Sequence, residues 1–195
     1  MQAIWQQRLR RARELAKLSP VEPDILDFYC QMAGLQAAVS EHQPLPNLHL
    51  LQALAAHPGG DPMHAFFRRL LRQADCPAAT QTDPARCPHC NESPVAVLVS
   101  ANRRELLCGV CFRRWPHVDA HCLACGADTI TLHPDDPHHE FPHIALETCP
   151  ACGTYLKRIG DGTAVPEVDE LASVIVDLWA AAQGFTKLHT NLLGL

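Results

Sequence analysis

The sequence predicts an α+β protein in which an N-terminal helical bundle precedes two small four-cysteine modules and a C-terminal helix. Apolar residues recur every three or four positions up to about residue 75 and again after residue 163. Between them, eight of the ten cysteines form four Cys-x-x-Cys pairs. We expect a helical domain at residues 1–75, a linker at 76–86, modules at 87–121 and 122–162, and a helix with a tail at 163–195.

The N-terminal segment carries amphipathic helix patterns. Trp5, Leu9, Ala12 and Ala16 form the first apolar stripe. Basic residues between positions 8 and 17 could form a docking strip, but charges on the outer face of such a helix are usually solvated, and we favour that interpretation. Helix-start signals predict three further helices, after Pro23, Asn47 and Asp61.

The middle and the end of the chain have different patterns. The short β-rich runs Val95–Val99 and Ile144–Leu146 predict strands between the cysteine pairs. From Pro166 to Gly184 the spacing predicts one helix that packs back on the N-terminal lobe.

The composition narrows the class of protein. A hydrophobic share of 47% with 19% charged residues is typical of an ordered globular chain. Residues 1–86 hold 9 Lys/Arg against 8 Asp/Glu, whereas residues 87–195 hold 7 against 13. The cysteine-rich half is therefore acidic, which argues against nucleic acid as a partner. The N-terminus lacks a secretory pattern and no window reaches the roughly 18 apolar residues of a membrane span, so we expect a cytoplasmic protein without membrane insertion.

The paired cysteines are the candidate metal ligands. Two intervening residues allow one tight turn to aim both sulfurs at a common ion, and two such turns complete a tetrahedron. Pairing neighbours gives loops of 17 and 23 residues, although interleaved pairing stays open. Local disulfides and redox pairs are disfavoured because the strand and helix alternation of a thioredoxin-like fold is missing. The predicted ligands of two metal ions are Cys87, Cys90, Cys108, Cys111, Cys122, Cys125, Cys149 and Cys152.

The residue after each Cys-x-x-Cys pair must adopt the backbone conformation that closes the turn. Gly126 and Gly153 suit a left-handed backbone there, and Asn91 is the next best choice. Phe112 breaks this pattern, so we expect its turn to be looser, or shaped by packing of the phenyl ring. Four sulfurs around an ion suit both zinc and iron, and leave no open position for hydrolysis.

The clustered histidines and the two unpaired cysteines are not predicted to bind metal. His133, His138, His139 and His143 lie in an acidic, proline-containing insert that is typical of a solvated loop between two strands. Cys30 and Cys76 lack ligand-spaced partners and are predicted to be dispensable. Motifs for phosphate binding, a serine nucleophile or a helical zinc protease are missing, which favours a protein that is not an enzyme.

The cysteine-rich half resembles the formate dehydrogenase accessory proteins of the FdhE family. The blocks that carry this resemblance are Cys87-Pro88-His89-Cys90, Leu107-Cys108-Gly109-Val110-Cys111 with Trp115, Cys122-Leu123-Ala124-Cys125-Gly126, Cys149-Pro150-Ala151-Cys152-Gly153-Thr154-Tyr155-Leu156-Lys157 and Asp169-Glu170-Leu171-Ala172-Ser173. They span about residues 87 to 186.

The resemblance implies a helical N-terminal domain followed by rubredoxin-like, or zinc-ribbon-like, modules that bind iron. It also implies a role in maturation, through binding to the catalytic subunit of formate dehydrogenase. A rubredoxin-type electron carrier is the alternative, and a zinc-ribbon nucleic-acid-binding protein is disfavoured by charge. Zinc remains the alternative metal, and the oligomeric state, including a homodimer, stays open.

Overall fold

The computed structural model describes residues 4–18, 83–119, 121–133, 141–161, 165–192 and 194, with isolated positions between 56 and 80. The first predicted helix is confirmed as α1 (Ile4–Leu18). The helices predicted after Pro23, Asn47 and Asp61 fall mainly on residues outside this description, so the helical bundle stays a prediction. No helix among the described residues combines the length and the apolar character needed to cross a bilayer.

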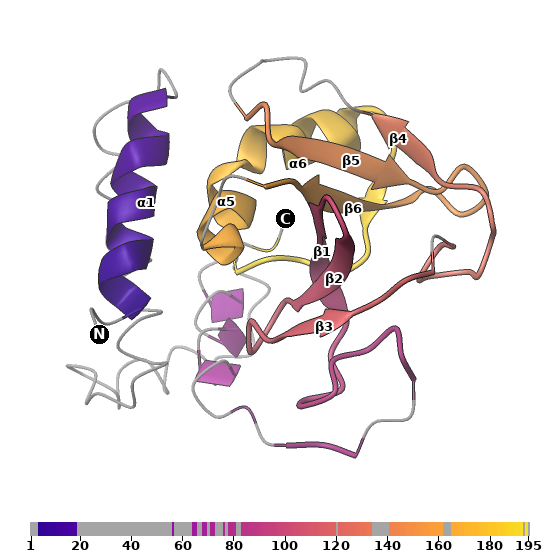
Figure 1. Cartoon of the computed structure of the whole chain (residues 1–195), viewed down its shortest axis with the longest axis horizontal. Helices are drawn as coiled ribbons and strands as arrows, with labels where there is room; N and C mark the ends of the chain where they lie inside the picture. The colour runs from indigo at the N-terminus through magenta and orange to yellow at the C-terminus, as the bar shows by residue number, and fades with distance from the viewer. Residues whose placement is uncertain are drawn as a thin grey trace.

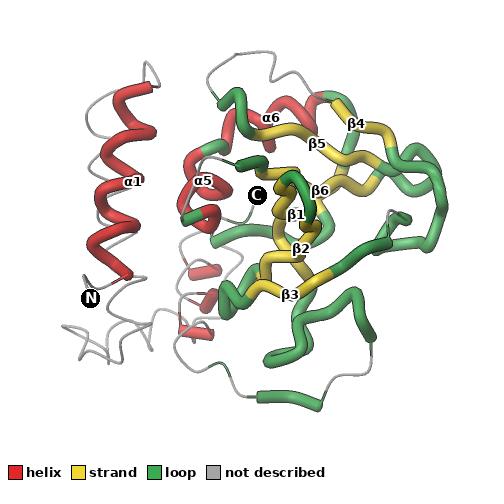
Figure 2. Tube along the Cα trace, in the orientation of Figure 1, coloured by secondary structure: helices red, strands yellow, loops and turns green. Residues whose placement is uncertain are grey.

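The cysteine-rich half forms one mixed sheet (Figures 1 and 2). Its strands run in the order β3-β2-β1-β6-β5-β4, and β7 pairs with β6. Their bounds are β1 (Pro94–Ser100), β2 (Arg103–Cys108), β3 (Arg114–Pro116), β4 (Thr131–His133), β5 (Ile144–Thr148), β6 (Thr154–Ile159) and β7 (Thr186–Lys187). The predicted strands Val95–Val99 and Ile144–Leu146 are confirmed within β1 and β5.

The sheet contains the same unit twice. In each unit a Cys-x-x-Cys turn leads into an antiparallel hairpin, and a second such turn leads into a third antiparallel strand. The units are β1-β2-β3 and β4-β5-β6, and they join through parallel pairing of β1 with β6, where Ala96 lies opposite Lys157. The two modules therefore share one sheet, with β1 and β6 in its interior.

Two helices follow the sheet where one was predicted. They are α5 (Pro166–Ala172) and α6 (Val174–Ala182), separated at Ser173. The Ser173 hydroxyl donates to the carbonyls of Asp169, at 2.8 Å, and Glu170, at 3.2 Å, and this competition with the backbone is a known cause of helix bending. Gly184 then takes a φ of 85° after the helix, as its position at the helix end predicts.

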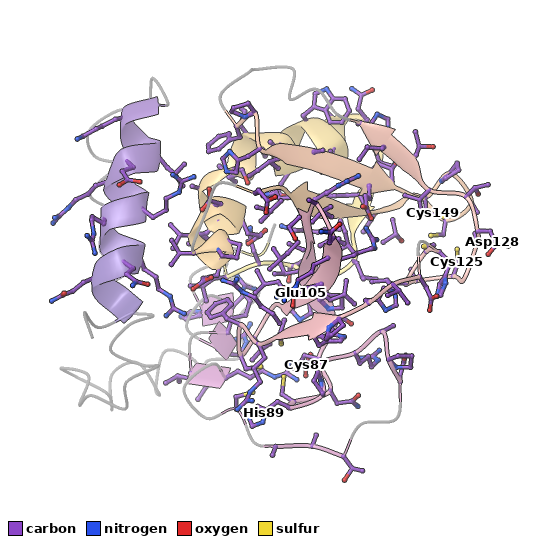
Figure 3. The ribbon with its side chains drawn as sticks, in the orientation of Figure 1. Cys87, His89, Glu105, Cys125, Asp128 and Cys149 are labelled. Carbon is purple, nitrogen blue, oxygen red and sulfur yellow. The ribbon has the colours of Figure 1, made fainter. Side chains whose placement is uncertain are left out.

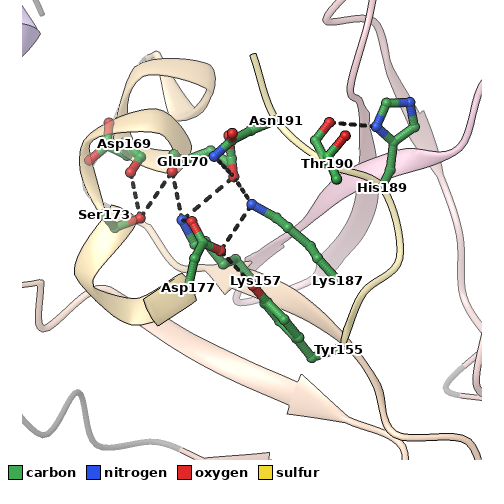
Figure 4. A network of polar contacts seen from close by, with 10 residues as sticks. All are labelled: Tyr155, Lys157, Asp169, Glu170, Ser173, Asp177, Lys187, His189, Thr190 and Asn191. Carbon is green, nitrogen blue, oxygen red and sulfur yellow. Dashed lines mark hydrogen bonds and ion pairs between the residues drawn. The ribbon is translucent and has the colours of Figure 1, made fainter. Parts of the chain in front are cut away.

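The buried side of these helices carries acidic residues as well as apolar ones. Lys157, on β6, is fully buried, and its ammonium donates to Asp177 Oδ2 at 2.6 Å and to the Glu170 carbonyl at 2.7 Å (Figure 4). Lys187 pairs with Asp177 Oδ1 at 3.0 Å and with the Glu170 carboxylate, and the Tyr155 hydroxyl donates to Asp177 Oδ1 at 2.8 Å. We call these five residues the buried ionic cluster.

The buried ionic cluster balances two ammonium groups with two carboxylates. Burial lowers the pKa of Lys157. Burial also opposes the charge of Lys187, but the carboxylates of Glu170 and Asp177 outweigh it and raise the pKa of Lys187. Burial and the neighbouring Asp177 raise the pKa of Tyr155, which keeps its hydroxyl protonated. The cluster ties β6 and β7 to both helices and leaves little net charge inside the protein.

Helix α1 lies against α5, on the side away from the sheet (Figure 1). The Arg8 side chain is buried and bonds Glu167 at 2.9 Å, and Arg11 bonds Asp169 at 2.6 Å. Asp169 also contacts His143 Nε2 at 2.6 Å. The predicted packing of the C-terminal helix on the N-terminal lobe is confirmed. The solvated-surface interpretation is wrong for Arg8 and Arg11, because both find carboxylates on α5.

Replacing Lys157 by methionine should destabilise the fold by about 3–5 kcal/mol, because it leaves two buried carboxylates with one cation. The matched control is Arg158→Met at the next position of β6, where the side chain is only half-buried. That change should stay within about 0.5 kcal/mol. Urea unfolding followed by circular dichroism measures both, and equal effects would contradict the role of the cluster.

Arg8→Met should cost about 3–5 kcal/mol, since Glu167 would lose its partner while remaining buried. Arg13 is exposed on the same helix, so Arg13→Met should change the free energy of unfolding by less than about 0.5 kcal/mol. Denaturant titration of the two variants gives the comparison. An Arg8→Met protein as stable as the control would show that α1 does not dock as described.

Candidate metal centres

The first group of sulfurs comes from the turns on either side of the β1-β2 hairpin. Cys87 and Cys90 precede β1, whereas Cys108 ends β2 and Cys111 follows it. Cys87 Sγ lies 3.5 Å from Cys111 Sγ, and Cys90 Sγ lies 3.5 Å from Cys108 Sγ and 3.7 Å from Cys111 Sγ. These four side chains converge on one point.

The second group repeats this arrangement around the β4-β5 hairpin. Cys122 Sγ lies 3.7 Å from Cys152 Sγ, and Cys125 Sγ lies 3.7 Å from Cys149 Sγ. Figure 3 shows the sulfurs of Cys125 and Cys149 close together beyond the ends of β5 and β6, and the Cys87 sulfur in a separate place below β3. The structure thus brings neighbouring pairs together, rather than interleaved ones.

The sulfur spacing fits a four-coordinate metal. Metal–sulfur bonds of about 2.3 Å in a tetrahedron place neighbouring sulfurs about 3.8 Å apart. A disulfide would need about 2.05 Å, and the cysteines of both groups are free. The residues present therefore fit zinc or iron, and the donor set does not choose between these metals.

The four turns share one backbone conformation. The amide of the first cysteine donates to the residue five positions on, as in Cys87 to Glu92, at 2.9 Å, and Cys108 to Arg113, at 2.9 Å. The residue after each second cysteine has a positive φ, including Phe112 at 56°. In three of the turns the residue after the pair, Asn91, Gly126 or Gly153, also donates its amide to the carbonyl of the first cysteine, and the described hydrogen bonds of the Phe112 turn do not include this one. The expectation of a turn shaped by packing of the Phe112 ring is confirmed. The left-handed backbone of Phe112 costs about 1–2 kcal/mol, and the ring packs against the core under the Arg8 guanidinium, 5.3 Å from the ring centroid.

Hydrogen bonds favour ionised sulfur in each group. The amides of Val110 and Cys111 point at Cys108 Sγ from 3.3 and 3.4 Å. A hydrogen bond from Cys108 lowers the pKa of Cys111 to about 5, whereas the same contact, together with burial, raises the pKa of Cys108. The contact between Cys152 and the Thr154 hydroxyl, at 3.2 Å, lowers the pKa of Cys152 to about 6. Each group therefore holds a thiolate at neutral pH, which is the form that binds metal.

The two groups differ in their access to solvent. Cys90 and Cys111 are half-buried in the first group, whereas Cys125 and Cys152 are exposed in the second. Trp115 is buried in the core around the first group, and its indole donates to the Pro84 carbonyl at 3.0 Å. The second group should therefore exchange an ion, or react with an oxidant, more readily than the first.

The cysteine spacing did not predict the position of Cys76. Its side chain packs beside Cys90 and Cys111 in the core around the first group. Burial, followed by the contacts with these two cysteines, raises the pKa of Cys76 to about 12. Cys76 is not one of the four cysteines whose sulfurs lie within 4.8 Å of one another in the first group. Only its nearness in sequence to Cys87 could have indicated this position. Cys30 lies outside the described residues.

The histidine insert has a structural role at both of its described ends. His133 Nε2 lies 3.0 Å from the Thr148 hydroxyl, and its ring meets Trp179 edge-on at 5.8 Å. His143 pairs with Asp169. The residues between β4 and position 141, including His138 and His139, lie outside the described residues. At its described ends, the insert connects antiparallel strands, as the sequence predicts.

Comparison with known proteins finds similarity to FdhE proteins in sequence and in fold. The chain is 34% identical over 120 residues to the protein FdhE homolog of Aquifex aeolicus, covering 55% of this chain and 41% of that protein. The FdhE homolog of Pseudomonas putida is also 34% identical, over 123 residues, covering 56% and 38%. The crystal structure of the FdhE protein from Pseudomonas aeruginosa superposes with a TM-score of 0.72 at 20% identity, covering 99% of this chain and 96% of that chain. No protein-family model matches the chain.

These findings confirm the resemblance to FdhE proteins that the sequence predicts. The aligned segment spans about two fifths of the length of the curated relatives it matches. The similarity of the solved structure extends the shared fold over nearly all of the chain. Two of the blocks that carry the resemblance, at 149–157 and 169–173, supply Tyr155, Lys157 and Glu170 to the buried ionic cluster.

The chain should hold two metal ions when purified without oxygen, one in each group of four cysteines. Cys108→Ser combined with Cys111→Ser should leave one, because a closed site does not survive the loss of two of its four ligands. Elemental analysis gives the count. The control Cys76→Ser should retain both ions, and a wild-type content below about 1.5 ions per chain would contradict the assignment.

Proposed function

We propose that this chain is an accessory protein for the maturation of formate dehydrogenase, and that its eight paired cysteines hold two metal ions. The observation that carries this proposal is the coincidence of two complete four-cysteine groups with sequence blocks like those of the curated FdhE homologs. The partner would be the catalytic subunit of formate dehydrogenase, met in the cytoplasm. Iron is the metal that the resemblance favours.

The surroundings of the two groups support a binding role rather than catalysis. Each set of four sulfurs closes its metal, so neither site offers a position for a substrate. The fold around them is fixed by buried ion pairs, which tie α6 to the sheet and α1 to α5. A protein that presents a rigid surface to a partner needs such fixation, whereas a small electron carrier does not need the additional helices.

One observation favours the alternative of an electron carrier, namely the exposure of the second cysteine group. Cys125 and Cys152 reach solvent, as an electron-transfer centre requires for contact with its redox partner. A carrier needs iron, because zinc has no redox chemistry. A protein that binds its partner through a folded surface retains that binding with either metal.

Purified wild-type protein, loaded with iron or with zinc, should recover the catalytic subunit of formate dehydrogenase from an extract of formate-respiring cells. Mass spectrometry identifies the subunit, and circular dichroism shows that the bait is folded. The Cys76→Ser variant serves as a matched control and should recover it equally. Recovery of no dehydrogenase subunit by a folded bait with two metals would reject the proposal. Recovery by the iron form alone would favour the carrier.

A further inference from the structure

A third group of metal-ligand side chains lies between the two cysteine groups. His117 and His121, with Asp119 between them, place one ligand atom each within 4.8 Å of one another. The segment follows β3 and ends at Cys122, so it connects the first module to the second. The two imidazole rings meet edge-on, with centroids 5.9 Å apart. In the sequence, these three residues form a His-x-Asp-x-His pattern.

His117 is held in place from its backbone. Its amide donates to the Arg104 carbonyl at 3.0 Å, which continues the pairing of β3 with β2 by one residue. The side chain is only 4% exposed. Its Nε2 is buried and has no hydrogen-bond partner within the described part of the chain. An unpaired buried imidazole nitrogen costs roughly 1–3 kcal/mol, so a ligand at this position removes a penalty that the fold otherwise bears.

The charges around His117 permit a cation. Arg104 is the nearest fixed positive charge, but its guanidinium forms two hydrogen bonds of 2.7 Å with the Glu147 carboxylate. Burial lowers the pKa of His117, which keeps the imidazole neutral, and Asp119 and Asp83 contribute negative charge near it. A neutral imidazole can donate its lone pair to a metal.

We propose that His117, Asp119 and His121 form a third metal site, for a divalent ion such as Zn²⁺, distinct from the two cysteine groups. Two imidazoles and one carboxylate are the nitrogen and oxygen donors that such ions prefer. Ligands around a tetrahedral ion lie about 3.3–3.5 Å apart, so the exposed Asp119 and the half-buried His121 would draw in toward the fixed His117.

This site would differ from the cysteine groups in its chemistry. Three protein ligands leave a fourth position open for water or another small ligand, whereas four thiolates leave none. One of its ligands is also exposed, so the ion would be exchangeable. The site would thus be a labile position whose last ligand, His121, immediately precedes Cys122 in the sequence.

The test uses the untagged full chain with zinc in both cysteine groups, freed of excess metal and titrated with Zn²⁺ in a calorimeter. A third equivalent of Zn²⁺ should bind. Asp119→Ala and His121→Ala should each lower its affinity at least tenfold, because losing even a residue that only hydrogen-bonds to a metal ligand lowers metal affinity by about 10–100-fold. Asp128→Ala, which removes another exposed carboxylate, is the matched control and should leave it unchanged. Nitrogen chemical shifts of His117 report coordination directly.

Asp119 is exposed, so its replacement should not disturb folding, and circular dichroism checks this point. Absence of a third equivalent in the wild type would overturn the proposal and indicate that water satisfies His117 Nε2. A third equivalent that survives both Asp119→Ala and His121→Ala would also overturn it, because the ion would then bind elsewhere. The two cysteine groups remain loaded in every arm, so these results do not bear on the role in formate dehydrogenase maturation.

Discussion

The pairing of the Lys157 ammonium with Asp177 is the interaction on which the arrangement of the molecule depends. Lys157 lies in the interior of the sheet, opposite Ala96 on one side and Leu146 on the other, and it is fully buried. Its charge can stay there only if carboxylates reach it, because an isolated buried ion is very costly. Asp177 and Glu170 meet that need, and they fix α5 and α6 over the sheet. Such a cluster specifies one arrangement more than it adds net stability.

The buried ionic cluster also determines where the N-terminal helix α1 packs. With α5 held by the buried ionic cluster, Glu167 and Asp169 form an acidic site for α1. Arg8 then lies between Glu167 and the ring of Phe112, which belongs to a turn of the first cysteine group. The strained backbone at Phe112 is thereby offset by packing that glycine could not provide. The first metal centre is thus tied to α1 through one aromatic ring.

The duplicated unit explains how two closed centres come to differ. Both use the same turns and hairpin, yet β1 and β6 are interior strands while β3 and β4 lie at opposite edges of the sheet. The first group is covered by Trp115 and its neighbours, whereas two sulfurs of the second group reach solvent. Equal ligand sets in unequal surroundings give one shielded and one accessible centre, since solvent access governs how metal sites exchange and react.

The sequence by itself determined the four Cys-x-x-Cys pairs, the strands within β1 and β5, and the helix α1, because spacing and periodicity are local properties of the chain. Which pairs of cysteines meet was decided by the tertiary structure. The sequence did not determine the partners of charged residues. The helical pattern predicts a solvated Arg8 and does not indicate a buried partner for Lys157, because their carboxylates lie 159 and 20 residues away in the sequence. The break at Ser173, the approach of Cys76 to the first group and the meeting of His117 with His121 were likewise decided by tertiary structure. Burial creates the need for a partner, and only the folded chain shows which side chain can meet it.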